Sequence, residues 1–267
     1  MGIFKSYFFP LKHAALVGQF ARRAVQARYR QSWLGTAWLA LTPLLMLGIY
    51  TLVFRHVFKV RWSGVDESNL SFALRLYAGL AVFNFFAECI NRAPGLVLAE
   101  PHLVKKVVFP LEILPWVNIL AASVQLGMAL LILLLLGGWD QGRWHLSVLA
   151  LPLVWLPLLP LVLGLSWILA GIGAYVRDTE QVVAMLMSLL LFLSPIFFPL
   201  EALPAPWQAW MNLNPLAPVM TGTRSVLLLG QWPDWWQLGW VFLGCSLLAT
   251  AGAAFFQHVR KGFADVV

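Results

Sequence analysis

The stretch Arg28–Trp62 reads RYRQSWLGTAWLALTPLLMLGIYTLVFRHVFKVRW, and from Gln31 to Phe54 it contains no acidic or basic side chain. Basic residues stand on both sides of this uncharged segment. A helix rises about 1.5 Å per residue, so about 20 apolar residues cross a hydrocarbon core of roughly 30 Å. The stretch therefore predicts a membrane-spanning helix. Pro43 lies inside it and removes one backbone hydrogen bond, which predicts a kink.

The composition of the whole chain supports the same class. The 267 residues are 61% hydrophobic and only 11% charged, whereas a soluble domain carries about 25% charged residues. No long polar segment interrupts the chain, so we expect residues 1–267 to form a single membrane domain. The net charge of +7 lies between apolar runs, which favours contact with anionic lipid headgroups over binding of nucleic acid.

The apolar runs predict an all-α integral membrane protein with six transmembrane helices. They cover about residues 35–54, 69–89, 114–136, 148–174, 182–195 and 235–256. The second run gives the weakest prediction, because Arg75 and Glu88 leave few uncharged residues between them. The fourth run contains Pro152, Pro157 and Pro160, so we expect its first half to be bent or broken.

Two further segments flank these spans. Residues 1–34 are basic, and their helical spacing places one set of polar side chains opposite one set of apolar side chains, which predicts a cytoplasmic helix in the membrane surface. A solvated leader is the alternative. The polar set is Gln19, Arg22, Arg23, Gln26 and Arg30, and the apolar set is Val17, Phe20, Ala21 and Ala24.

Residues 195–234 are rich in proline yet apolar, which predicts a re-entrant outer segment between the fifth and sixth spans.

An even number of spans places both termini on the same side of the membrane. The segments on that side hold twice as many Lys and Arg residues as the segments on the other side. The positive-inside rule therefore predicts cytoplasmic termini. Tryptophans such as Trp62, Trp139, Trp144, Trp232 and Trp236 lie near the predicted outer connections, where their rings anchor at an interface.

The sequence offers no motif for catalysis of its own. It contains neither a GxxxxGK[ST] phosphate loop nor a GxSxG nucleophile motif. The five histidines are scattered and the two cysteines fall in separate apolar runs, so we expect no catalytic, metal-binding or cofactor-binding residues in this chain. Glu88 is the nearest candidate for a buried ionisable group, and its spacing favours a helical pair with Arg92.

With catalysis by this chain set aside, the function class that remains is a transport conduit driven by another protein. The predicted cytoplasmic segment Gly95–Phe109, GLVLAEPHLVKKVVF, combines apolar residues with Glu100, Lys105 and Lys106, so a helix here could dock into a groove of a soluble partner. An interfacial helix that only anchors the loop is the alternative. Arg177 and Asp178 lie in the other cytoplasmic connection and form a smaller candidate contact or a solvated turn.

Aromatic residues are the second group of candidates. Sugar rings present apolar C–H faces that stack on aromatic rings without one fixed hydrogen-bond pattern, which suits a sliding polymer. Ordinary core packing or lipid contact is the alternative for each ring. The candidates along spans one, two and five are Trp38, Tyr50, Phe54, Phe83, Phe85, Phe86, Phe192, Phe197 and Phe198.

Several short motifs, taken in order, resemble a known family. They are RYRQSWLG and FKVRW around the first span, PHLVKKVVFPLEILP at residues 101–115, YVRDTEQVV at 175–183, LSPIFFPLEALP at 193–204 and NPLAPVMTGTRSVLL at 214–228. Together they resemble the membrane subunits (permeases) of ABC-2 type exporters for bacterial surface polysaccharides. The motif FKVRW favours the O-antigen branch over the capsule branch.

The resemblance implies a homodimer in the bacterial inner membrane, joined to two copies of a separate ATPase subunit that binds Mg-ATP. The cargo would be a lipid-linked polysaccharide. Arg28, Tyr29 and Arg30 would mark the cytoplasmic entrance. The residues that receive the ATPase stroke would be Glu100, His102, Leu103, Lys105, Lys106, Arg177 and Asp178. Teichoic acid, capsule, lipid or drug export is an alternative, and a membrane-embedded lipid-linked sugar transferase is an alternative of another class.

Overall fold

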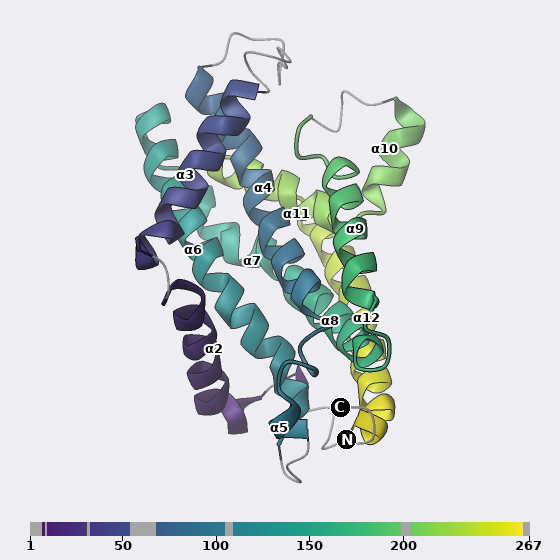
Figure 1. Cartoon of the computed structure of the whole chain (residues 1–267). Coiled ribbons are helices and arrows are strands. Elements are labelled where there is room, and N and C mark those ends of the chain that lie inside the picture. The colour runs from purple at the N-terminus through teal and green to yellow at the C-terminus, as the bar shows by residue number, and fades with distance from the viewer. Residues whose placement is uncertain are drawn as a thin grey trace.

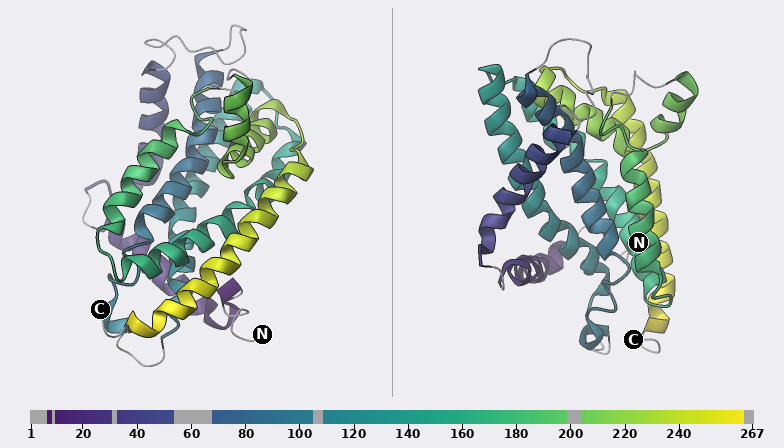
Figure 2. Two further views of the ribbon diagram at one scale, coloured as in Figure 1. Left: turned by 90° about the vertical axis from the view of Figure 1, so that its right-hand side faces the viewer. Right: turned by 45° about the horizontal axis from the view of Figure 1, so that its top comes forward.

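The computed structural model describes residues 7–8, 10–30, 33–53, 68–104, 109–198 and 204–263, and every regular element in these ranges is a helix (Figure 1). The first long element is α2 (Ala14–Tyr29), which packs against α6 (Leu114–Gln141). The polar residues predicted to share one side of α2 are exposed, while Val17 and Ala21 are buried. In the right-hand view of Figure 2, α2 is seen nearly end-on, so it crosses the direction of the long helices.

The first predicted span begins with a short 3-10 turn, Gly35–Ala37, and continues as α3 (Trp38–Thr51), which contains Pro43. Gly35 adopts a left-handed conformation with φ of 50°, and this lets the chain turn from α2 into α3. Helix α3 packs against α4 (Asn69–Arg92) and α6. Its side chains Leu44, Leu45 and Ile49 remain exposed on the outside of the bundle.

Helix α4 is the centre of the bundle. It contacts α3, α6, α8 (Leu158–Gly173), α9 (Thr179–Phe192) and α11 (Leu216–Arg224). Of the six predicted spans this one has the weakest support in the sequence, yet α4 is one continuous helix. Within its most apolar 18-residue window, 72% of the residues are buried inside the molecule. A helix surrounded by protein tolerates polar side chains that a lipid-facing helix does not, which explains its low hydropathy.

The third and fourth predicted spans differ in regularity. A 3-10 turn, Leu111–Ile113, leads into α6, which extends five residues past the predicted end, to Gln141. The fourth span is broken into a 3-10 turn Leu146–Ala150, α7 (Leu151–Trp155) and α8. The break before α8 falls at Pro157, as the three prolines predicted, because proline cannot donate the backbone bond that would continue the helix.

The C-terminal third contains shorter elements before a last long helix. After α9 come α10 (Ala205–Asn212), α11 and a π-helical turn, Ser225–Leu229. Helix α12 (Trp235–Val259) then runs back along α8 and ends in a 3-10 turn, Arg260–Gly262. The backbones of α8 and α12 approach closely, since a Cβ atom added at Gly252 would lie 2.4 Å from the carbonyl oxygen of Gly164.

Four helical stretches of the described residues are long and apolar enough to cross a membrane: Asn69–Arg92, Leu111–Gln141, Leu146–Gly173 and Trp235–Gly262. Three apolar stretches are shorter, namely Gly35–Thr51, Thr179–Phe192 and Leu216–Leu229. The all-helical class with several membrane spans is therefore confirmed. The count of six spans and the re-entrant segment stay predictions.

The bundle has two distinct ends (Figure 1). Helix α2, the short helix α5 (Pro101–Val104) and the C-terminal end of α12 lie at one end. The C-terminal end of α6 and helix α10 lie at the other. Exposed tryptophans gather on elements near this second end, among them Trp139, Trp144, Trp232 and Trp236, whereas Trp62 lies outside the described residues.

Candidate functional site

Three of the predicted aromatic residues come together near the C-terminal end of α9. The ring centroid of Phe197 lies 6.2 Å from that of Tyr50 on α3 and 6.1 Å from that of Phe192 on α9. Phe192 is 67% exposed, whereas Phe197 is buried. We call Tyr50, Phe192 and Phe197 the ring cluster. It joins the first predicted span to the end of the fifth and the turn after it, and Tyr50 and Phe197 are 147 residues apart in sequence.

A buried arginine holds the turn that carries Phe197. The guanidinium of Arg224 donates to the carbonyl oxygens of Pro195 at 2.6 Å, Ile196 at 2.8 Å and Arg75 at 2.8 Å. Gly79 on α4 leaves room for it, because a Cβ atom there would lie 2.3 Å from Nη2 of Arg224. Arg224 thus fastens the turn after α9 to helix α4 and positions the ring cluster.

Arg224 is not among the site residues predicted from the sequence. One feature of the sequence could have indicated its importance: Arg224 is the only basic residue in the proline-rich apolar segment 195–234. A charged side chain in such an environment must be fully hydrogen-bonded. A second contact supports the same turn: the amide of Asn214 donates to the Ser194 hydroxyl at 3.1 Å.

Four other predicted path residues that the structure describes have different environments. Phe83 and Phe86 are 4% and 3% exposed and belong to the core around α4. Because α4 is enclosed by other helices, these two rings fill the bundle here, and their role in the polysaccharide path stays a prediction. Phe85, named with them, is also buried. Phe198 is half-buried against the core, and Trp38 lies at the opposite end of α3. Phe54 lies outside the described residues.

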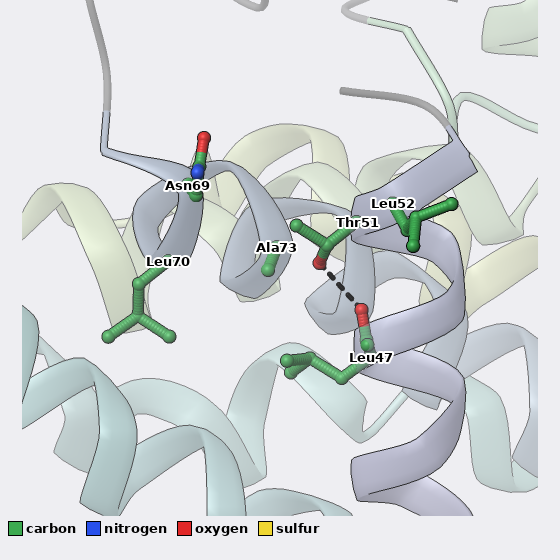
Figure 3. A pocket seen from close by; sticks show the side chains of 7 residues that line it. Leu47, Thr51, Leu52, Asn69, Leu70 and Ala73 are labelled. Atoms are coloured by element: carbon green, nitrogen blue, oxygen red, sulfur yellow. Dashed lines mark hydrogen bonds between the residues drawn. The ribbon is translucent and has the colours of Figure 1, made fainter. Parts of the chain in front are cut away.

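An apolar groove of about 590 Å³ lies between α3 and α4 (Figure 3). Leu47, Thr51 and Leu52 line it from α3, and Asn69, Leu70 and Ala73 line it from α4. The Thr51 hydroxyl donates to the Leu47 carbonyl at 2.6 Å, so its polar atom is satisfied within α3. The groove suits a hydrocarbon chain better than a sugar, which needs hydrogen-bonding partners.

The predicted coupling segment Gly95–Phe109 is not one continuous helix. Residues 93–99 form successive turns, and in the part of the segment that the structure describes only Pro101–Val104 is helical, as α5. Lys105 and Lys106 lie outside the described residues. Proline has no N–H group and disfavours helical geometry at the residue before it. Pro101 can therefore begin α5 but cannot continue a helix from Gly95.

The two predicted cytoplasmic connections meet in space. A Cβ atom at Gly173, at the end of α8, would lie 2.3 Å from the carbonyl oxygen of Pro94. A Cβ atom at Gly95 would lie 2.5 Å from Oε1 of Glu180 in the first turn of α9. His102, Arg177 and Asp178 are exposed at this end, while Glu100 and Leu103 are half-buried. We call residues 93–104 and 174–180 the coupling surface.

The predicted entrance residues have separate environments. Arg28 forms an ion pair with Glu88 and donates to Gln125 Oε1 at 3.3 Å. The predicted pair between Glu88 and Arg92 is therefore wrong. The packing of α2 on α6 brings Arg28 to Glu88 from another helix, and Arg92 is exposed. Arg30 is also exposed, and the backbone of Tyr29 ends α2.

A cluster that the sequence did not reveal joins the two ends of the chain. Tyr7 packs edge-to-face on Trp167 at 5.4 Å and on Phe256 at 6.5 Å. Arg260 forms an ion pair with Glu112 at 3.1 Å, directly before α6. Burial raises the pKa of Tyr7 to about 12, and the nearby Arg260 offsets only part of that effect. The indole N–H of Trp167 also donates to the Glu112 carbonyl at 3.2 Å, so the chain directly before α6 is fastened to α8 and to the turn after α12.

Metal-ligating side chains do not gather in the part of the chain that the structure describes. No group of three or more His, Cys, Asp or Glu residues comes together there. Cys89 and Cys245 are both buried and form no disulfide.

Comparison with known proteins gives consistent matches. A family model described as ABC-2 type transporter matches residues 16–228. The O-antigen export system permease protein RfbA of Myxococcus xanthus is 26% identical over 259 residues, which cover 96% of each chain. RfbA of Klebsiella pneumoniae is 22% identical over 247 residues, 91% of each chain. The polysialic acid transport protein KpsM of Escherichia coli is 26% identical over 215 residues, 78% of this chain and 79% of that one.

Proposed function

Because the chain belongs to the ABC-2 type transporter family, we propose that it is the membrane-spanning subunit of an ATP-driven exporter that moves lipid-linked polysaccharide across the bacterial inner membrane. The proposed cargo is O-antigen. The observation that carries the proposal is the match to RfbA of Myxococcus xanthus over 96% of both chains. A match of this extent includes every predicted span and both connections of the coupling surface.

We propose six spans, with the segments around α3 and α9 completing the four long ones, and with both termini in the cytoplasm. The ends of the bundle support this arrangement, because α2 and the C-terminal end of α12 lie at the same end (Figure 1). The excess of Lys and Arg in the segments at this end agrees with a cytoplasmic location. The turn after α9, α10 and α11 would then form the outer re-entrant segment.

The proposed assembly is a homodimer with two copies of an ATPase subunit, which would bind Mg-ATP. The conformational change of the ATPase subunits would be transmitted to this chain at the coupling surface. The close backbone approach of Pro94 to Gly173 supports that role, because a displacement of the chain at Pro94 would push directly on the end of α8. A partner shifts a conformational equilibrium only through contacts that differ between the two states.

The ring cluster is the proposed contact for the sugar polymer. Its exposed member, Phe192, offers a flat apolar face; Phe197 packs against that ring, and Tyr50 packs against Phe197. Weak stacking on such a face suits a polymer that must slide. Polysialic acid or another capsule polymer is a second candidate cargo, which the similarity to KpsM favours.

A strain lacking this gene tests the proposed function. We expect lipid-linked polysaccharide to accumulate on the cytoplasmic face while the cell surface stays bare, and we expect the intact gene to restore surface polymer. Absence of the polymer altogether would contradict export and indicate an enzyme such as a sugar transferase. Normal surface polymer would show that the cargo is of another kind.

The role of the ring cluster is tested in the same strain. Replacing both Phe192 and Phe197 with Ala should slow the appearance of surface polymer without changing the amount of protein in the membrane. Phe242→Ala removes an exposed ring from α12, outside the cluster, and serves as the matched control. Equal export by both variants would contradict a polymer contact at the ring cluster.

A further inference from the structure

A second groove lies between α2 and the bundle, at the end opposite the ring cluster. Its volume is about 340 Å³, within the range of ligand pockets, roughly 300–1,000 Å³. Its apolar walls are formed by Phe20, Ala24 and Ala27 of α2 and by Leu114, Val117 and Ala121 of α6. Phe20 contacts Phe109 with ring centroids 5.8 Å apart. Neither α3 nor α9 contributes to this groove.

Three charged side chains line the same groove: Arg23 on α2, Arg92 at the end of α4 and Glu100 before α5. Among the described residues, neither arginine forms an ion pair with a carboxylate, and both are exposed. The groove therefore carries a net charge of about +1, set beside an apolar wall. The polar amide of Asn118 is already engaged, because it donates to the Cys89 carbonyl at 2.9 Å.

The depth of the groove in the membrane follows from α6. Leu114 begins the long uncharged run of this span, so the groove lies where the hydrocarbon core meets the headgroups. Basic pockets between helices on the cytoplasmic side suit anionic lipid headgroups. An arginine presents several donors in a planar fork that fits phosphate oxygens.

From this geometry we infer that the groove between α2 and α6 is a binding site for a bilayer phospholipid with a singly charged anionic headgroup. Arg23 and Arg92 bind the phosphate, and the apolar wall takes the first part of an acyl chain. The net charge of about +1 matches a phosphodiester such as that of phosphatidylglycerol. The bound lipid fills the space between α2 and α6.

The test measures lipid binding to the full-length chain in detergent by native mass spectrometry, with added phosphatidylglycerol or phosphatidylcholine. Replacing both Arg23 and Arg92 with Gln should weaken phosphatidylglycerol binding about thirtyfold, because each basic residue near a headgroup contributes on the order of a fivefold factor. Replacing Lys261 and Arg143, both exposed, with Gln removes the same charge outside the groove and should leave binding unchanged.

A second variant tests the apolar wall without changing the charge. Ala24→Leu places a larger side chain in the groove and should also weaken phosphatidylglycerol binding. Ala15→Leu, at an exposed position on the same helix, is its control. A photoreactive phosphatidylglycerol should label the peptides that contain residues 20–27 and 114–121.

Four results would overturn the inference. The first three are equal binding of phosphatidylcholine and phosphatidylglycerol, an equal loss of binding in the two double Gln variants, and photolabelling elsewhere in the chain. Displacement of phosphatidylglycerol by an equal concentration of a polyprenyl diphosphate would also overturn it and assign the groove to the carrier lipid. Because the readout is lipid binding, failure here would leave the proposed export function untouched.

Discussion

At the scale of single residues, Arg224 has the most demanding environment. Its guanidinium donates to three backbone carbonyl oxygens on two separate segments. In Arg224→Ala these buried acceptors lose their donors, each at about 1–3 kcal/mol. We expect the free energy of unfolding to fall by about 3 kcal/mol or more, measured by thermal unfolding in detergent.

Lysine at this position tests whether charge alone is sufficient. Arg224→Lys keeps the charge but lacks the planar fork that reaches three carbonyls, so it should recover only part of the lost stability. Arg143→Ala, which removes an exposed arginine, should change stability by about 0.5 kcal/mol or less. Full recovery by lysine would contradict the carbonyl clamp.

The ion pair between Arg28 and Glu88 gives a second residue-scale prediction. A double-mutant cycle with Arg28→Gln and Glu88→Gln should show a coupling energy of about 0.5–3 kcal/mol, as expected for side chains in direct contact. The same cycle with Arg92→Gln in place of Arg28→Gln should show coupling near zero. Coupling to Arg92 instead would support the helical pair that the sequence suggested.

At the scale of elements, the contact between α8 and α12 depends on small residues. Gly164 and Gly252 face each other so closely that an added Cβ atom at Gly252 meets backbone. Gly252→Ala should therefore lower the free energy of unfolding by about 1–3 kcal/mol through overpacking. Gly244→Ala on the same helix enters open space and should raise it by up to about 1 kcal/mol through helix propensity. Thermal unfolding of the two variants gives the comparison.

At the scale of the whole molecule, the proposed topology places the two ends of the bundle on opposite sides of the membrane. Single cysteines introduced by Arg143→Cys or Trp232→Cys should react with a membrane-impermeant maleimide added to spheroplasts. Cysteines introduced by Arg30→Cys or Arg177→Cys should react only after the membrane is opened. Native Cys89 and Cys245 are buried, so the background should be low, and Ala in their place removes it. Labelling of Arg177→Cys in sealed spheroplasts would contradict cytoplasmic termini.

The sequence by itself determined the membrane class, the helical positions, the exposed polar side of α2 and the break in the fourth span. These features follow from local causes. Hydropathy sets which segments leave water, helical periodicity sets the sides of a helix, and proline removes a backbone donor wherever it lies. Each cause acts within a few residues, so it can be read along the chain.

Only the tertiary structure decided which side chains meet. Arg28 and Glu88 are 60 residues apart, and Arg224 and Arg75 are 149 apart. Phe83 and Phe192 look alike in the sequence, yet one fills the core and the other is exposed. The order of apolar segments does not say which helix is enclosed by the others. That depends on how close backbones approach at small residues such as Gly79, Gly164 and Gly173, because packing between helices, rather than hydropathy, sets their neighbours within a membrane.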